Sequence, residues 1–227
     1  SFERSYQTIL ERLNKNAVRM QMAIGAEDNF EGVVDLLKMK AFYFEGPMGD
    51  TIVEKEIPEN LKEEALKYNA ELIEKIVEQD DTLMSEYLDG KIPSIDVLKA
   101  TMRKAVIANK IFPVFTGTAL KNKGVQLVLD AVVDYLPSPT DIPSIKGVNP
   151  ETEEKMERKA SDQEPFSALA FKVATDPFVG QLIFFRVYSG SLSSGSYVYN
   201  PRTGNKERIG RILRMHANDR EEVKKVF

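Results

Sequence analysis

A short apolar run, a loop of small residues and a periodic helix constrain this 227-residue chain more than any other stretch. Residues 111–116 are rich in Phe and Val, which predicts a buried strand, and residues 117–124 follow it as a glycine-bearing loop. The next apolar residues recur at helical spacing: Val125, Val128, Leu129, Val132 and Leu136. Pro137 and Pro139 stop this helix. The stretch therefore predicts a strand, loop and helix that end one α/β layer near residue 140.

The loop of this unit is a candidate ligand site. It lies outside the carboxyl end of a strand, where open α/β sheets bind their ligands and where backbone N–H groups are free to meet a polar ring or a phosphate. The alternative is an ordinary turn between strand and helix, since small residues form turns in either case. The candidate binding residues are Gly117, Thr118, Ala119 and Leu120.

The chain before this unit reads as the end of one domain and an insertion within it. Residues 1–24 predict an amphipathic helix followed by a strand at 18–24. Residues 25–109 predict three short antiparallel strands, at 32–37, 39–44 and 51–57, and then three helices. These helices start at Pro58, near residue 83 and after Ser94. Because this block precedes the strand and helix of residues 110–140, it is expected to be an inserted α+β subdomain.

The chain after residue 140 changes composition. Residues 141–163 are rich in Pro, Ser, Asp, Glu, Lys and Thr with little periodicity, which predicts a linker. Within residues 164–227, strands are expected at 166–174, 182–188, 197–199 and 206–215. The predicted fold class is an α/β domain with an α+β insertion, followed by a partial all-β barrel.

Charge and composition limit the setting. No apolar run approaches the ~20 residues of a membrane helix, and residues 1–12 lack the apolar core of a secretory signal. The absence of cysteine excludes a thiolate metal site and fits a reducing cytoplasm. Residues 45–96 carry 15 acidic and 5 basic residues, whereas residues 161–227 carry 7 and 10. The acidic region would repel nucleic acid, and it is either a solvated face or a docking surface for a protein.

A basic stripe near the end of the chain is a candidate RNA contact. In one unbroken strand, Lys206, Arg208 and Arg214 would leave the sheet on the same face. These cations either contact the phosphate backbone of RNA or are surface charges that keep an edge strand soluble. No aromatic residue interleaves with Arg208 and Arg214 on that face, so backbone contact is expected rather than base stacking. The whole candidate set is Arg202, Lys206, Arg208, Arg211 and Arg214.

The sequence predicts no catalytic residue and no metal site. It contains no glycine-rich phosphate loop that ends in Lys and Ser or Thr. His216 is the only imidazole, and no Ser or Cys nucleophile is paired with it in sequence, so a structural or solvated role is expected. This chain by itself is therefore expected to hold no triphosphate.

Several long motifs in order carry a family resemblance. The most specific are residues 117–126 with 129–139, and 164–172 with 176–180; others are 185–190, 215–218 with 220–222, 22–25 and 32–36. Together they resemble the bacterial elongation factor G family, translational GTPases that couple GTP hydrolysis to translocation of tRNA and mRNA on the ribosome. The likeness spans the whole chain.

The resemblance implies roles for each part. Residues 1–24 and 110–140 look like the end of a P-loop GTPase domain, and residues 25–109 like its inserted subdomain. Residues 164–227 look like part of the second domain. The loop at residues 117–120 corresponds to the last guanine-recognition motif, in which the residue matching Ala119 presents its N–H to the guanine oxygen. The intact protein would bind GTP or GDP with Mg²⁺ in the cytoplasm. Its inserted subdomain would meet the ribosomal stalk protein, and its barrel the small-subunit ribosomal RNA.

This sequence departs from the family pattern in several ways. Thr118 stands where the family often has Ser, a change that keeps the hydroxyl. The phosphate loop, both switch regions and the Asn-Lys-x-Asp motif are missing, and His216 does not match the catalytic histidine. The chain is thus expected to be an internal piece without GTPase activity of its own. The alternatives are a related translational GTPase, such as a ribosomal protection protein or release factor, and a non-enzymatic ribosome-binding paralogue.

Overall fold

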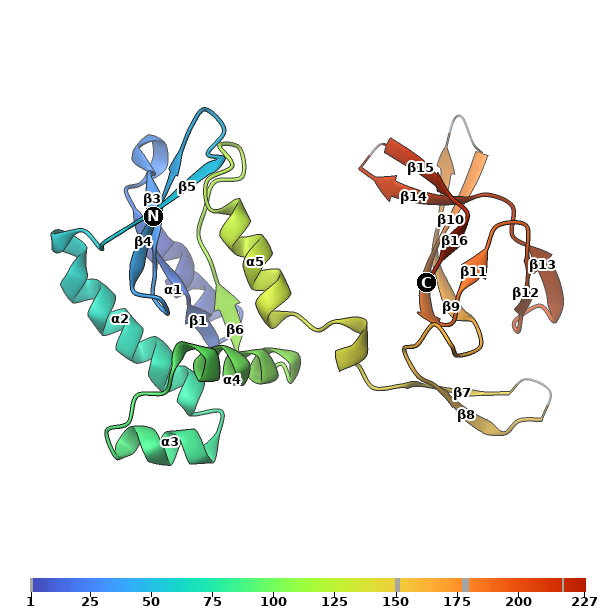
Figure 1. Ribbon diagram of the computed structural model, residues 1–227, viewed down its shortest axis with the longest axis horizontal. Helices are drawn as coiled ribbons and strands as arrows, with labels where there is room; N and C mark the ends of the chain where they lie inside the picture. Colours follow the sequence, from blue (N-terminus) through green and yellow to red (C-terminus); the bar gives the residue numbers. More distant parts are fainter. Residues whose placement is uncertain (1, 150–151, 177–179, 218) are drawn as a thin grey trace. The chain divides into compact units, whose positions relative to one another are not determined.

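The computed structural model describes residues 2–149, 152–176, 180–217 and 219–227. The chain forms two compact units, Ser1–Leu136 and Pro137–Phe227. The first combines helices with sheets, and the second is built from β-hairpins (Figure 1). This confirms the predicted fold class, an α/β unit followed by an all-β unit.

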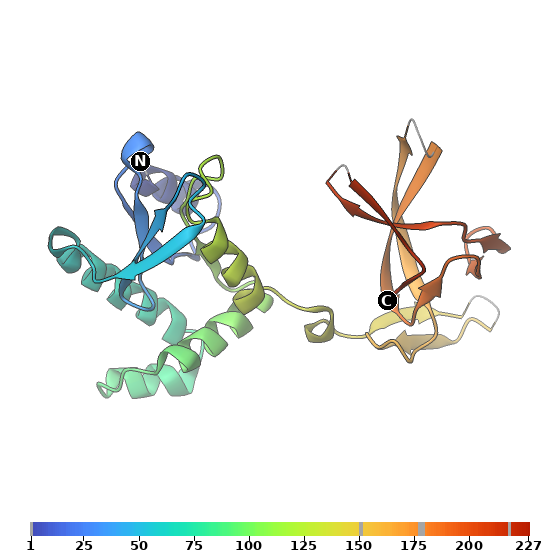
Figure 2. The ribbon, with the colours of Figure 1, turned by 45° about the horizontal axis from the view of Figure 1, so that its top comes forward.

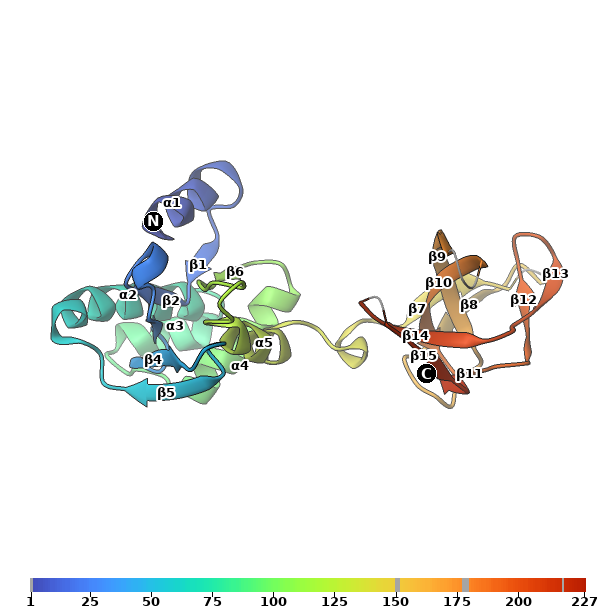
Figure 3. The same cartoon turned by 90° about the horizontal axis from the view of Figure 1, so that it is seen from above.

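Two parallel strands form the base of the first unit. Strand β1 (Ala17–Arg19) pairs with β6 (Phe112–Val114), although Ala17 and its partner Phe112 lie far apart in sequence. Helix α1 (Phe2–Arg12) lies beside β1, and the Tyr6 hydroxyl donates to the carbonyl of Ala17 at 3.0 Å (Figure 3). Helix α5 (Val125–Tyr135) follows β6. The predicted strand and helix are therefore present, but the strand is shorter than expected and is not buried: Phe112 is exposed, and Pro113 and Val114 are half-buried.

The single strand expected at 18–24 is wrong, because the chain changes sheets at Met20. Beyond it, β2 (Gln21–Ile24) pairs with β3 (Gly32–Asp35) in a separate antiparallel sheet. The Met20 N–H donates to Val114 O at 3.0 Å, and Met20 O accepts from the Leu36 N–H at 3.0 Å. Through these two hydrogen bonds, Met20 joins the parallel pair to the antiparallel sheet.

The inner strands of the second sheet are buried on both faces. The strand order of this sheet is β2–β3–β4–β5, with β4 at Lys40–Glu45 and β5 at Thr51–Lys55. Successive residues of β3 face opposite ways, so Val34 joins the main core and Val33 joins a smaller aromatic cluster. Leu127 of α5 packs against that aromatic cluster. The strands predicted for this block are confirmed, and they are held between helices (Figure 2).

Three helices complete the inserted block, α2 (Glu59–Val77), α3 (Asp81–Leu88) and α4 (Ile95–Ile107). Ser94 caps α4 as predicted, since its hydroxyl accepts the Val97 N–H, while Asp80 caps α3. Pro58 is the N-cap of α2, so that helix begins one position later than expected. Leu72 and Ile76 of α2 and Met102 of α4 enter the main core.

The second unit consists of antiparallel strand pairs. They are β7 (Ile145–Val148) with β8 (Lys155–Arg158), β9 (Ser167–Asp176) with β10 (Gly180–Ser189), β11 (Leu192–Ser193) with β16 (Lys225–Val226), β12 (Tyr197–Asn200) with β13 (Asn205–Arg208), and β14 (Ile212–His216) with β15 (Asp219–Val223).

The second unit corrects two expectations. The predicted linker at 141–163 contains the β7–β8 hairpin. Met156 and Arg158, on the less exposed face of β8, are only half-buried, so this strand does not need the apolar residues that would mark it in the sequence. The single strand expected at 206–215 is two strands with different partners. Between them, the Ile209 N–H donates to Ser196 O at 2.8 Å and Ile209 O accepts from the Gly195 N–H at 2.8 Å. These bonds end the first ladder before the second begins.

Candidate functional site

The predicted ligand loop leaves the carboxyl end of β6, at the edge that the parallel pair presents (Figure 1). Gln21 fixes the start of this loop, because its Oε1 accepts the Thr116 N–H at 3.2 Å. The Gln21 side chain is only 1% exposed, so this bond is shielded from water. The sheet therefore sets where the loop begins.

Backbone hydrogen bonds close the loop, but two of its N–H groups have no acceptor among the described residues. Thr118 and Lys123 exchange both of their backbone hydrogen bonds, at 2.9 and 3.1 Å, and the Asn122 N–H donates to Ala119 O at 3.1 Å. Ala119 and Leu120 form the exposed turn of this closed loop, and Leu120 is 90% exposed. Their two amides have no acceptor among the residues that the structure describes. Free, exposed N–H groups at a strand end can meet a ligand oxygen.

Two glycines make the base of the loop narrow. A Cβ on Gly117 would lie 2.7 Å from Lys123 O, and one on Gly124 would lie 2.9 Å from Thr116 O. Gly124 also has φ of +87°, in the left-handed region, where it forms the N-cap of α5. Larger residues would force the two sides of the loop apart. The predicted residues 117–120 are thus held together in one compact turn.

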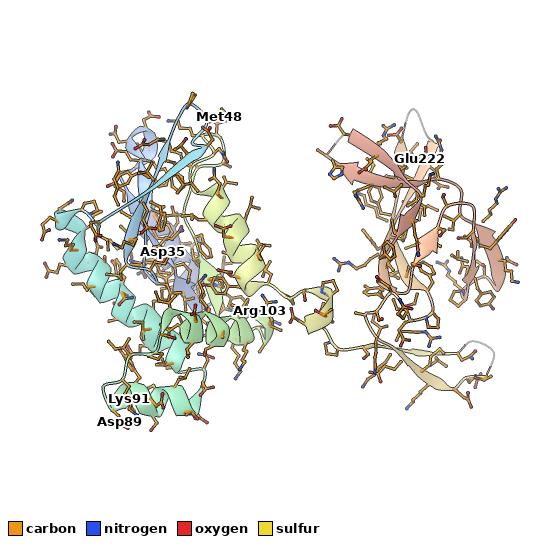
Figure 4. The ribbon with its side chains drawn as sticks, in the orientation of Figure 1. Asp35, Met48, Asp89, Lys91, Arg103 and Glu222 are labelled. Carbon is orange, nitrogen blue, oxygen red and sulfur yellow. The ribbon has the colours of Figure 1, made fainter. Side chains whose placement is uncertain are left out.

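The inserted sheet braces the loop, a feature that the sequence analysis missed. The Lys123 Nζ donates to Phe30 O at 2.9 Å, and the Gln126 Nε2 donates to Gly49 O at 3.1 Å. Met48 lies at the tip of the β4–β5 hairpin (Figure 4), and the next residue, Gly49, lies against the loop, since a Cβ there would be 2.9 Å from Lys121 O. These contacts join residues 77 to 93 positions apart, so no local pattern could predict them.

A second polar cluster fixes the far end of α5. The Arg103 guanidinium donates to Val133 O at 3.1 Å and to Asp134 O at 2.9 Å, where the helix carbonyls lack partners within the helix. Lys99 forms an ion pair with the Asp134 carboxylate at 2.6 Å. Both cations come from α4, and cations are favourable at a helix C-terminus. The helix that follows the loop is therefore held at both ends.

The described residues hold no cluster of metal ligands, and the single histidine lies far from the loop in sequence. Among the described residues, no three His, Asp or Glu side chains gather as a metal would require. His216 lies in the other unit, 63% exposed, with its Nε2 3.5 Å from Glu221 Oε2. What the loop presents to solvent is the pair of backbone N–H donors of Ala119 and Leu120.

The structure divides the predicted basic stripe. Lys206 and Arg208 lie on β13, opposite Tyr199 and Tyr197 of β12. Arg214 lies on β14 and forms an ion pair with Glu221 at 3.6 Å. The remaining two candidates, Arg202 and Arg211, lie in the β12–β13 turn and between β13 and β14.

The prediction that Lys206, Arg208 and Arg214 share one face of one strand is wrong, because the ladder changes partner between them. No aromatic residue was expected beside Arg208 and Arg214, but Tyr197 lies opposite Arg208 across the ladder, and Tyr199 lies opposite Lys206. Their aromatic neighbours are on the paired strand, which a count along a single strand does not reach.

The acidic region lies mainly on exposed surfaces of the inserted block. On α2, Glu63 and Glu64 are exposed with Asn60 and Lys67 around a shallow depression. Tyr68 donates to Glu64 Oε1 at 2.8 Å.

No helix among the described residues is long and apolar enough to cross a membrane.

Comparison with known proteins gives a family match for part of the second unit and a shared fold for the whole chain. Residues 180–227 match the family model described as elongation factor Tu domain 2. A crystal structure of a protein from Thermus thermophilus shares the fold, with a TM-score of 0.76 and 22% sequence identity. The match covers 100% of this chain and 31% of that protein, so this chain spans about a third of its length. The first similarity concerns residues 180–227 alone, and the second shows that the chain shares its fold with part of that protein.

Proposed function

We propose that this chain is the guanine-recognition end of the GTPase domain, the inserted subdomain and part of the second domain of an elongation factor G. The intact protein would couple GTP hydrolysis to translocation of tRNA and mRNA. One observation carries the proposal: the free amides of Ala119 and Leu120 lie at the carboxyl end of a parallel strand, in a chain whose residues 180–227 are similar to elongation factor Tu domain 2.

The proposed recognition step uses one hydrogen bond. The Ala119 N–H donates to the guanine O6, with the Leu120 N–H beside it. Adenine carries an amino group at that position, so the same N–H would face another donor and lose its bond. A site built to pair a polar group rejects analogues that cannot pair with it far more strongly than an apolar pocket does. In this proposal, guanine specificity comes from the loop amides, which can donate to O6 of guanine but not to the amino group of adenine.

The ligand of the intact protein is GTP or GDP with Mg²⁺. In this proposal, residues 117–120 contact the base, and groups outside these 227 residues hold the phosphates and the metal. The sequence has no phosphate loop, and the described residues offer no cluster of metal ligands. The chain alone is therefore expected to hydrolyse no GTP. Turnover of radiolabelled GTP by the purified chain, above the rate with heat-denatured chain, would refute this.

The proposed partner is the ribosome. The exposed carboxylates of α2 suit a basic protein surface, which we assign to the ribosomal stalk protein. The β unit carries the excess of cations and suits the small-subunit ribosomal RNA. Co-sedimentation of the chain with ribosomes at low and high salt tests this pairing, since ionic contacts weaken as salt rises.

The guanine assignment is tested by NMR on the isotope-labelled chain. Guanosine monophosphate at millimolar concentration is expected to shift the Ala119 and Leu120 amide signals, because these amides change hydrogen-bond partner. Adenosine monophosphate is the matched ligand control. Leu120→Ala is the matched variant, because its 90% exposed side chain can be removed without moving the amide. Equal shifts with both nucleotides would show that the loop does not read guanine.

A further inference from the structure

The β12–β13 hairpin gathers two tyrosines and two cations on one face of its unit. In the antiparallel register, Tyr197 lies opposite Arg208 and Tyr199 lies opposite Lys206. Directly opposed residues point to the same side of a sheet, and so do residues two apart on one strand. The four side chains therefore share a face, which we call the Tyr–Arg face. The hairpin stands at the edge of its unit (Figure 1).

The Tyr–Arg face is open to solvent. Tyr197 is 65% exposed and Tyr199 is 48% exposed, and both cations are exposed. Within the described residues, no side-chain hydrogen bond or ion pair occupies Tyr197, Tyr199, Lys206 or Arg208. Large aromatic side chains that stay uncovered beside free cations indicate a binding surface.

The one carboxylate of the hairpin points the other way. Glu207 lies between the two cations along β13, so its side chain leaves the opposite face. There it accepts a hydrogen bond from the Asn200 Nδ2 at 2.6 Å, and the Asn200 Oδ1 accepts the Arg202 N–H at 3.0 Å. These bonds hold the turn that brings Arg202 to the tip. The Tyr–Arg face thus carries positive charge without an acidic neighbour from its own hairpin.

The spacing of the tyrosines suits separated bases. Two residues along a strand are about 6.7 Å apart, which is twice the ~3.4 Å rise between stacked bases. Each ring can then stack on one base, with Lys206, Arg208 and Arg202 beside the backbone phosphates. A duplex hides its base faces inside the helix and could use only the cations. A single strand can use both kinds of contact.

We propose that the Tyr–Arg face binds unpaired bases of single-stranded RNA by stacking on Tyr197 and Tyr199. The inference rests on the proposed contact of the β unit with ribosomal RNA. It adds that the hairpin binds the unpaired bases of that RNA. It replaces the expectation of backbone contact alone. Charge complementarity favours a polyanion, and the paired exposed rings favour one that presents base faces.

The test measures anisotropy of a fluorescent 12-nucleotide oligouridylate titrated with the full 227-residue chain. The variant Tyr197→Val with Tyr199→Val keeps residues of high β propensity on the strand and is expected to weaken binding at least ~25-fold, about 5-fold or more for each lost stack. Phe171→Val is the matched control, because Phe171 is a 62% exposed aromatic on β9, and its affinity is expected to stay unchanged. Circular dichroism confirms that each variant is folded.

Charge and stacking are separated by two further measurements. Arg208→Gln is expected to reduce the slope of log affinity against log salt by about 0.7, the value for one phosphate on a single strand. A 12-base-pair RNA duplex and an abasic strand are expected to bind more weakly than oligouridylate. Affinity unchanged by the tyrosine substitutions, or equal binding of the abasic strand, would overturn the proposal.

Ribosome co-sedimentation separates this inference from the proposed function. A chain that pellets with ribosomes but binds no oligouridylate would refute the Tyr–Arg face and leave the proposed function standing. A chain that binds oligouridylate through its tyrosines but does not pellet would uphold the face and refute the ribosomal role.

Discussion

Replacing Arg19 by Met should loosen the attachment of α1 to the rest of its unit. The Arg19 guanidinium is buried, with its Cζ 4.6 Å from the ring centroid of Tyr6 and 3.7 Å from that of Tyr68. It also forms an ion pair with Glu3 at 2.8 Å. Through these contacts, one side chain on β1 joins α1 to α2. The Met side chain keeps the apolar stem and removes the charge.

The magnitude follows from the three contacts. A cation over an aromatic ring contributes about 0.5–2 kcal/mol, more when desolvated, and an ion pair to a half-exposed carboxylate adds about 0.5 kcal/mol. Burial by itself would lower the pKa of Arg19, but its interactions with Tyr68 and Glu3 outweigh burial and raise that pKa. The contacts thus favour the charged form on balance. Two ring contacts and one ion pair together give an expected loss in free energy of unfolding of about 1.5–4.5 kcal/mol.

The assay is urea unfolding followed by circular dichroism at 222 nm, where the signal comes from α-helices. The α-helices that the structure describes all lie in the Ser1–Leu136 unit, so the signal reports that unit. A double-mutant cycle of Arg19→Met and Tyr68→Leu should give a coupling of about 1 kcal/mol. Arg12→Met, at an exposed site on α1, is the control and should change stability by less than about 0.5 kcal/mol. A coupling below about 0.3 kcal/mol would show that the ring and the cation do not stabilise each other.

Three further substitutions test the packing and the loop. Met102→Ala, at a fully buried core position, should lower the free energy of unfolding by about 2–5 kcal/mol in urea melts, against less than about 0.5 kcal/mol for the 61% exposed Leu66→Ala. Gly124→Ala should lower the melting temperature more than Gly90→Ala. Both glycines have positive φ, but only the Cβ at 124 meets a backbone atom, and equal shifts would contradict this. Burial raises the pKa of Asp35, so the folded state holds that proton more tightly and stability falls as pH rises through the folded pKa. Asp35→Asn should therefore gain stability relative to the unmodified chain as the pH rises from about 4 to about 7, measured by urea melts at both values, and no gain would refute the sign.

Local patterns predicted most elements of the fold and the candidate loop. The N-cap Ser94, the β-branched and aromatic residues of β3 and β4, and the small residues 117–120 each act through neighbours a few positions away. Such interactions can be predicted from short windows of sequence. The position of the loop at a strand end followed from the same reasoning, and its free amides at Ala119 fit that expectation.

Only the tertiary structure decided which strands pair and what braces the site. Met20 ends one sheet and begins another because its N–H and C=O find partners on two different strands. Lys123 reaches Phe30, and Tyr197 meets Arg208 across a ladder. Each of these contacts depends on register between segments distant in sequence. The sequence therefore determined which stretches form strands, helices and turns. The packing of the whole chain determined which side chains share a face, because strand partners and register are set only when the apolar faces are buried together in the core.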